Sequence, residues 1–191
     1  MHALAATASP LVRRYRLDEF FELEPPPGGG HYEIIAGLLY MVPPPTGPHH
    51  MAVSRLVTAF GVYAASHPDR CVLFVPSAAV WTPADTYLLP DLFLVTTEHL
   101  AAMGAGTMTM ADLVVEVLSP SSAVYDRTAK ADTYAALGVR ELWLVDLERK
   151  AIEQRVLVGG RWEIRPPRTG MDPVEAAVFP GLVVVPQDVF A

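Results

Sequence analysis

The sequence feature that most constrains the fold is an apolar run interrupted by a single carboxylate. Residues 113–118 read Leu-Val-Val-Glu-Val-Leu. A continuous apolar run of this length, rich in β-branched residues, is typical of a central strand that is covered on both faces. Glu116 therefore points into a covered layer whichever way it faces. Because an isolated buried carboxylate is unfavourable, it is normally protonated, paired or bound to a metal, and Glu116 is the first candidate for a functional residue.

The length and composition of the chain predict one α/β domain with a full core. The chain has 191 residues, of which 51% are hydrophobic, and a single domain of this size can bury a complete core. We expect residues 1–16 to form a flexible N-terminal tail and residues 17–191 to form the domain. Only 18% of the residues are charged and the mean hydropathy is +0.28, which favours a buried self-interface and hence a homodimer.

The charge and the cysteine content limit the kinds of partner and compartment. The formal net charge is −7, whereas a protein that binds nucleic acid regardless of sequence usually carries a basic patch; a local basic groove stays compatible with this charge. The single cysteine, Cys71, excludes an internal disulfide and a cysteine metal cage, so a reduced cytoplasm is expected. No apolar run reaches the ~18–20 residues that span a bilayer, and the N-terminus lacks a signal-peptide pattern.

Hydrophobic periodicity and turn residues predict alternating helices and strands. Helices are expected over residues 17–23, 49–67, 97–103 and 126–137, and strands over a hairpin at 31–42 that turns at 36–37 and over 72–75, 78–81, 88–95, 113–118, 141–146, 152–157, 161–164 and 183–185. The helix between the strands 113–118 and 141–146 predicts a crossover connection, which makes these two strands parallel. The fold class is therefore α/β.

Two carboxylates on apolar strands form the first candidate site. Asp91 stands at the head of the strand 88–95, after Pro90, and Glu116 stands within the strand 113–118. If these strands are neighbours, the two carboxylates can converge on one metal ion. A site that offers a few carboxylate oxygen ligands and leaves room for water suits Mg²⁺ or Mn²⁺.

A lysine on the following helix adds the second half of the chemistry. Asp126 and Lys130 are four residues apart and share a helix face. A metal ion with a nearby ammonium group suits phosphodiester hydrolysis, because the metal activates water and the ammonium offsets the charge of the transition state. Simpler interpretations stay open for each residue: Asp91 as a strand start, Glu116 paired with an arginine, and Asp126 as a helix cap or a surface partner of Lys130.

Other candidates are weaker. His49 lies at the start of a helix and either lines the site or is exposed, and Glu33 interrupts an apolar strand where it would support the metal or a lysine. Ser119 follows a strand without the glycines of a nucleophile elbow. The chain also lacks a P-loop and a Gly-x-Gly-x-x-Gly motif, which excludes nucleotide binding by those routes.

The motifs carry a family resemblance over about residues 17–185. They are Pro90-Asp91, residues 112–121, the set Asp126, Lys130 and Tyr134, residues 138–146, and an opening pattern at residues 32–39 with His49 and Arg55-Leu56. Together they closely resemble the Uma2 family, also called DUF820, of the PD-(D/E)xK nuclease superfamily. This resemblance implies a single nuclease-like domain with a restriction-endonuclease-like core, in which helices flank a mixed central sheet.

The resemblance also implies roles for individual residues. Asp91 and Glu116 would be the metal-binding acids, and Glu33 matches an additional acidic position. The chain departs from the superfamily pattern at Leu118, which stands where the lysine of Glu-x-Lys is usual. Lys130 matches a helix lysine that is thought to replace it.

Two classes of function follow from these residues. The first is a Mg²⁺- or Mn²⁺-dependent endodeoxyribonuclease that hydrolyses phosphodiester bonds in DNA. In this hypothesis Asp91 and Glu116 bind the metal and Lys130 assists the attacking water. The supporting residues are Glu33, His49 and Asp126. The alternative is a catalytically inactive nuclease-fold protein that serves binding or assembly, which the acidic pI and the missing strand lysine favour. A resolvase-like dimer that acts on branched DNA is a third hypothesis.

Overall fold

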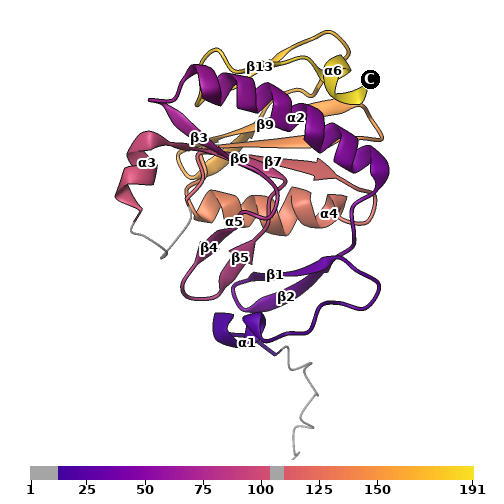
Figure 1. Ribbon diagram of the computed structural model, residues 1–191, viewed down its shortest axis with the longest axis vertical. Coiled ribbons are helices and arrows are strands. Elements are labelled where there is room, and N and C mark those ends of the chain that lie inside the picture. Colours follow the sequence, from indigo (N-terminus) through magenta and orange to yellow (C-terminus); the bar gives the residue numbers. More distant parts are fainter. Residues whose placement is uncertain (1–12, 104–109) are drawn as a thin grey trace, which may run out of the picture.

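A seven-stranded sheet runs through the middle of the protein in the computed structural model, which describes residues 13–103 and 110–191 (Figure 1). Residues 1–12 of the expected tail lie outside the described residues. The strand order is β10 (Arg161–Ile164), β9 (Ala151–Val158), β8 (Glu141–Asp146), β7 (Leu113–Leu118), β6 (Leu92–Thr96) and β3 (Cys71–Phe74), with β11 (Arg168–Thr169) also paired to β9. Strands β7 and β8 are parallel and the other pairs are antiparallel. The sheet is therefore mixed, and the predicted parallel pair is confirmed.

Strand β7 is the most completely covered part of the sheet. All six of its residues are buried, Glu116 included. Its side chains alternate between two apolar cores: Leu113, Val115 and Val117 belong to one core, and Val114 and Leu118 to the other. Glu116 shares the second face, so its carboxylate lies in a covered layer, as the apolar run predicts.

The long helix α2 (Gly47–Ser66) covers the first face (Figure 1). It begins two residues before the predicted start and ends one residue before the predicted end. Phe60 meets Trp143 of β8 edge-on, with ring centroids 5.5 Å apart. The C-terminal part of the chain packs into the same core through β12 (Val174–Glu175), β13 (Val183–Val184) and α6 (Pro186–Phe190). The strand expected at residues 183–185 is present as β13, which pairs with β12 in a separate two-stranded sheet.

A helix built from three consecutive pieces covers the second face. They are α4 (Ala123–Tyr125), a π-helical turn η1 (Asp126–Lys130) and α5 (Ala131–Ala136). The helix thus starts three residues earlier than the predicted start at residue 126. Ala131 and Tyr134 are fully buried against the sheet. The π-helical turn lies where Asp126 and Lys130 reach the site described below.

A second, four-stranded sheet lies beside this helix, in the order β2 (Leu38–Val42), β1 (His31–Ile35), β5 (Thr86–Leu88) and β4 (Val80–Thr82). The predicted hairpin is confirmed, with its turn at Ala36-Gly37. The expected single strand at 88–95 is wrong, because residue 88 belongs to β5 of the second sheet, whereas residues 92–96 form β6 (Leu92–Thr96) of the central sheet. Pro90 lies in the link between them, where a residue without an N–H cannot continue a ladder.

Two short helices complete the fold. They are α1 (Leu17–Phe21), which packs under the second sheet, and α3 (Thr97–Ala102), which follows β6. Both lie within the predicted ranges. Across the described ranges 13–103 and 110–191, we find no helix that is long and apolar enough to cross a membrane.

Candidate active site

The antiparallel pairing of β6 with β7 places Asp91 beside Glu116. Leu92 lies opposite Val115, so Asp91, one residue before Leu92, stands level with Glu116, one residue after Val115. The Asp91 carboxylate also accepts a hydrogen bond from the backbone N–H of Val117, at 2.7 Å from Oδ2. The two strands are therefore neighbours, as the metal-site hypothesis requires.

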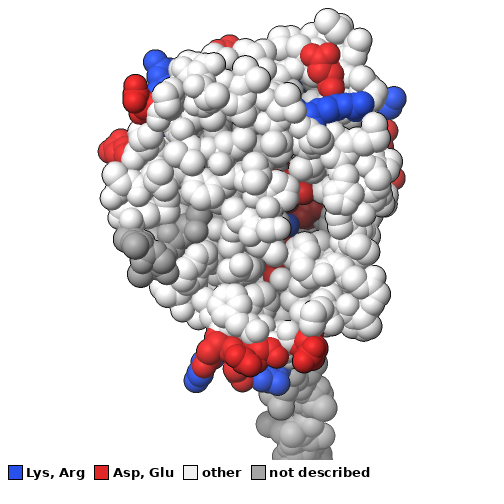
Figure 2. Space-filling view, in the orientation of Figure 1, with Lys and Arg blue, Asp and Glu red and all other residues white. Residues whose placement is uncertain are grey.

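Both carboxylates open onto one small cavity of about 80 Å³. Figure 2 shows it as a hollow in which acidic and basic side chains are visible, surrounded by uncharged surface. Its walls come from both sheets, the N-terminal end of α2 and the helix after β7, and the residues are His31, Val42, Pro43, Pro44, Pro45, His49, Leu89, Asp91, Glu116, Val117, Ser119, Ser122, Asp126 and Lys130. The structure thus brings five of the six predicted site residues to one cavity, and the sixth, Glu33, contacts it through Lys130.

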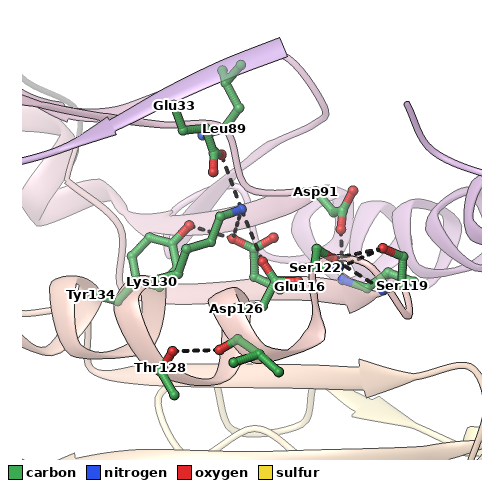
Figure 3. A network of polar contacts seen from close by, with 12 residues as sticks. Glu33, Leu89, Asp91, Glu116, Ser119, Ser122, Asp126, Thr128, Lys130 and Tyr134 are labelled. Carbon is green, nitrogen blue, oxygen red and sulfur yellow. Dashed lines mark hydrogen bonds and ion pairs between the residues drawn. The ribbon is translucent and has the colours of Figure 1, made fainter. Parts of the chain in front are cut away.

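Lys130 is the centre of the cluster (Figure 3). Its Nζ lies 3.1 Å from Glu33 Oε1, 3.1 Å from Glu116 Oε1 and 3.5 Å from Asp126 Oδ1. The lysine is only 3% exposed. The interpretation of Asp126 and Lys130 as a surface ion pair is therefore wrong, because the pair is buried among carboxylates from three elements.

Glu33 comes from the second sheet and is completely buried on β1. Its Oε1 accepts a hydrogen bond from the N–H of Leu89 at 2.8 Å. Burial opposes ionisation of Glu33, but the Lys130 ammonium, His31 and the Leu89 N–H together outweigh burial and lower its pKa. Glu33 is therefore a fixed negative partner of Lys130.

The pKa of Glu116 shifts in the opposite direction to that of Glu33. Its Oε1 accepts hydrogen bonds from Lys130 Nζ at 3.1 Å and from the Tyr134 hydroxyl at 2.6 Å. Burial nevertheless raises its pKa well above the ordinary value, since the attraction of Lys130 is offset by the neighbouring carboxylates of Asp126, Asp91 and Glu33. The ionised form of Glu116 thus lacks sufficient positive charge nearby.

The charge state of Lys130 follows from the same contacts. Burial by itself would lower its pKa, but Glu116, Glu33 and Asp126 raise it well above the ordinary value. The side chain is therefore an ammonium ion at neutral pH. It can donate hydrogen bonds and offset negative charge, but it cannot accept a proton from water.

His49 supports Asp91 from the first helical turns of α2. Its Nε2 lies 3.3 Å from Asp91 Oδ2, and its side chain is 12% exposed. Burial lowers its pKa, but the hydrogen bond and the charge of Asp91 outweigh burial and raise the pKa overall. Of the two interpretations of His49, the structure places it in the wall of the cavity.

Three aromatic or imidazole side chains at the site were given no role from the sequence, although Tyr134 stands in the motif that carries the family resemblance. Tyr134 donates to Glu116, the Tyr125 ring lies 5.5 Å from Lys130 Nζ, and His31 lines the cavity. Tyr134 had a usable signal, since it lies four residues after Lys130 and so on the same helix face. His31 and Tyr125 had none, because their positions depend on how the second sheet meets the helix.

The donor set fits a hard divalent cation that keeps much of its water. The polar contacts of Asp91 are made by its Oδ2 atom and those of Glu116 by its Oε1 atom. Within the described part of the chain, the second carboxylate oxygen of each residue accepts no hydrogen bond. Among the same residues, no three His, Cys, Asp or Glu side chains gather closely enough to enclose a metal ion. Mg²⁺ is commonly held by one or two carboxylates plus water and substrate phosphate, whereas a structural zinc site needs four protein ligands.

Comparison with known proteins assigns the family. The model of Uma2, described as "Putative restriction endonuclease", matches residues 17–187. A solved structure from Anabaena variabilis, titled as a putative nuclease belonging to DUF820, superposes with a TM-score of 0.73 at 19% identity, covering 92% of this chain and 97% of that chain. At this identity the likeness shows a shared fold, and no curated protein matches the chain. Because the family model matches most of its length, the chain belongs to the Uma2 family.

Proposed function

We propose that the protein is a Mg²⁺- or Mn²⁺-dependent endodeoxyribonuclease that hydrolyses phosphodiester bonds in DNA. The observation that carries the proposal is that one carboxylate within β7, another directly before the adjacent strand β6, and a buried ammonium group share one cavity. Membership of a family described as "Putative restriction endonuclease" supports the same reaction class. The acidic side chains and the lysine have the charges that a phosphoryl-transfer site needs.

In this proposal Asp91 and Glu116 hold the divalent cation through their free oxygens. When bound, the cation would lower the pKa of a water molecule and polarise the scissile phosphate. The cavity supports this assignment because Glu33, Asp91, Glu116 and Asp126 outnumber the cationic side chains around them. A bound cation would add the positive charge that ionised Glu116 lacks in its buried position among three other carboxylates.

Lys130 acts as a fixed donor, and the other residues hold it and Asp91 in place. Because it stays protonated, it orients the attacking water or offsets charge on the phosphoryl oxygens without serving as a base. Glu33 and Asp126 keep the ammonium beside Glu116, and His49 orients Asp91. This arrangement replaces the strand lysine, whose place is taken by the buried Leu118.

The cavity is too small for a whole nucleotide. Its volume of about 80 Å³ is well below the ~300–1,000 Å³ of pockets that enclose organic ligands. The proposed substrate therefore presents only a phosphodiester group to the cavity, while the bases and sugars stay outside. This fits a polymer chain that passes over the mouth of the cavity.

Cleavage of DNA with Mn²⁺ or Mg²⁺ tests the proposal. The wild type is expected to nick or cut plasmid DNA only with a divalent cation. Replacing a metal ligand by its amide (Asp91→Asn or Glu116→Gln), or removing the ammonium (Lys130→Met), is expected to lower the rate at least about 100-fold.

Glu175→Gln is the matched control, since Glu175 is an exposed carboxylate that accepts a backbone hydrogen bond from Gly181 away from the cavity. This variant should cut at the wild-type rate. Equal cleavage by wild type and Glu116→Gln would overturn the assignment of the site. Metal binding without cleavage of any DNA would favour the alternative, a nuclease-fold protein that binds or assembles without turnover.

We also propose that the protein forms a homodimer. The support is compositional: the mean hydropathy is positive, and Val62 of α2 and Val183 of β13 are exposed beside the same surface depression. Exposed apolar side chains that gather at one place are typical of interaction surfaces.

A further inference from the structure

The helix that carries Asp126 and Lys130 is widened at that point. Residues Asp126–Lys130 form a π-helical turn between the α-helical pieces α4 and α5. A single π turn within an α-helix shifts the backbone hydrogen-bond register, and such turns occur frequently at functional sites. Carbonyl oxygens that leave the regular ladder must find donors elsewhere.

Two side chains from the neighbouring strands donate hydrogen bonds to backbone carbonyl oxygens, one within this turn and one at the first residue after it. Arg155 of β9 donates through Nη1 to the carbonyl oxygen of Arg127 at 3.0 Å. Trp162 of β10 donates through its indole N–H to the carbonyl oxygen of Ala131 at 2.9 Å. These two contacts lie on either side of Lys130 in the sequence. Neither Arg155 nor Trp162 lines the cavity, so both hold the backbone near Lys130 from outside it.

The side chain of Arg127 is anchored to the same strands. It donates to Glu153 Oε2 at 2.7 Å and to Asp146 Oδ2 at 2.8 Å. Arg155 in turn donates through Nε to Glu153 Oε1 at 2.7 Å. Residue 127 is therefore fixed twice, by its guanidinium group and by its carbonyl oxygen, and Arg155 takes part in both attachments.

We propose that Arg155 is a positioning residue for the site: it fixes the π-helical turn so that Lys130 and Asp126 enter the cavity at the correct depth and rotation. The role in turnover rests on the proposed function, whereas the role in placing Lys130 does not. Arg155 is 8% exposed and, among the described residues, is not part of the cavity wall. It acts through the carbonyl group of Arg127, three residues before Lys130.

The geometry explains why this support matters. Glu33 and Glu116 stand on strands of two different sheets, and one ammonium group reaches both at 3.1 Å. If the turn relaxed toward α-helical geometry, Lys130 would rotate about the helix axis and lose one of these contacts. A displacement of about 1 Å is enough to lower a catalytic rate by roughly 100-fold.

Lysine labelling tests the placement of Lys130 without depending on activity. The chain contains two lysines, Lys130 and Lys150; the first is buried and the second is exposed. In reductive methylation followed by mass spectrometry, wild-type Lys130 is expected to stay protected while Lys150 reacts and serves as the internal reference. In Arg155→Met, Lys130 is expected to react at least about tenfold faster, because the turn opens locally.

Arg55→Met is the matched control. Arg55 also donates through Nη1 to a backbone carbonyl oxygen of another element, that of Val189, at 3.0 Å, but it lies away from the turn. This variant should leave the labelling of Lys130 unchanged even if it lowers the melting temperature as much as Arg155→Met does. Equal protection of Lys130 in the wild type and in Arg155→Met would overturn the proposal.

Steady-state cleavage of DNA adds the functional readout. Arg155→Met is expected to lower kcat by about tenfold or more with KM changed by less than about twofold, and Arg155→Lys should restore part of the loss. An unchanged kcat in Arg155→Met, with an active wild type, would limit Arg155 to a structural role. A wild type that does not cleave DNA would instead count against the proposed function, and the labelling result would still decide the placement of Lys130.

Discussion

At the scale of single residues, the site depends on one ammonium group that serves three carboxylates. Lys130 is in contact with Glu33, Glu116 and Asp126, and all four side chains are nearly inaccessible to solvent. Removing one partner of a buried ion cluster leaves the remaining charges unpaired, which is far more unfavourable than losing a surface pair. Replacing Lys130 is therefore expected to destabilise the protein far more than replacing Lys150, the other lysine of the chain.

Lys130→Met is expected to lower the free energy of unfolding by about 3–5 kcal/mol at neutral pH. The exposed Lys150→Met should change it by less than about 0.5 kcal/mol. Urea denaturation with EDTA present measures both variants. Equal stability of the two variants would show that Lys130 is not buried among the carboxylates.

The difference in unfolding free energy between the wild type and Lys130→Met is expected to depend on pH, with a defined sign. Lys130 helps to lower the pKa of Glu33, and a carboxyl group with a lowered pKa stabilises the folded state above its unfolded pKa and loses that effect as the pH falls through its folded pKa. This contribution is absent in Lys130→Met. The stability difference between wild type and variant should therefore shrink toward acid pH.

Residue-level prediction from the sequence succeeded where a local pattern determines the environment. The burial of Glu116 follows from the apolar residues on either side of it, whichever face they cover. The contact between Glu33 and Lys130 could not be derived in this way, because it joins residues 97 positions apart through the packing of the second sheet against the helix. The buried state of the Asp126–Lys130 pair depends on the same packing, which explains why a surface ion pair was an equally natural interpretation.

At the scale of elements, the site is assembled by the link between β5 and β6. Leu89 gives its N–H to Glu33 in the second sheet, and Asp91 accepts from Val117 in the central sheet. The link thus joins the two sheets at the cavity. An apolar pattern over 88–95 shows that strands are present, but it does not show that the chain changes sheets within it, so the sequence indicated one strand where there are two.

The tight turn between β1 and β2 places a residue other than glycine in the left-handed region. Ala36 and Gly37 both have positive φ, +49° and +79°, as a two-residue turn of type I′ requires. A Cβ atom added to Gly37 would lie 3.2 Å from the carbonyl oxygen of Tyr15. Since this hairpin carries Glu33, its stability bears directly on the site.

We expect Gly37→Ala to lower the free energy of unfolding by about 1–2 kcal/mol, the usual penalty for a left-handed conformation with a side chain. Ala36→Asn should raise it by about 0.5 kcal/mol, because Asn tolerates positive φ and Ala36 is exposed. Denaturation of both variants in urea measures the pair. A stabilising Gly37→Ala would contradict the turn geometry.

At the scale of the whole molecule, few basic side chains surround the cavity. The net charge is −7, and on the face that carries the cavity the Lys and Arg side chains outside the hollow lie near the edges of the view (Figure 2). Electrostatic attraction of DNA by a broad basic surface is thus absent on this face. A second copy of the chain would extend the surface available to a polymeric substrate.

Light scattering coupled to gel filtration is expected to give twice the mass of the chain, 20.7 kDa, for the wild type. Val62→Glu, which places a charge among the exposed apolar groups of α2, should shift the protein toward the monomer if this patch forms the interface. Glu98→Gln on α3 is an exposed control that should keep the wild-type mass. A monomer at all concentrations would contradict the proposed homodimer.

The central claim is that Asp91 and Glu116 form a divalent-cation site, and titration of Mn²⁺ by calorimetry tests it most directly. The wild type is expected to bind Mn²⁺ with a Kd of about 1 mM or tighter, Glu175→Gln should bind equally well, and Asp91→Asn and Glu116→Gln should each weaken binding at least about tenfold. Mn²⁺ binding that is absent in the wild type, or unchanged in both site variants, would contradict the account.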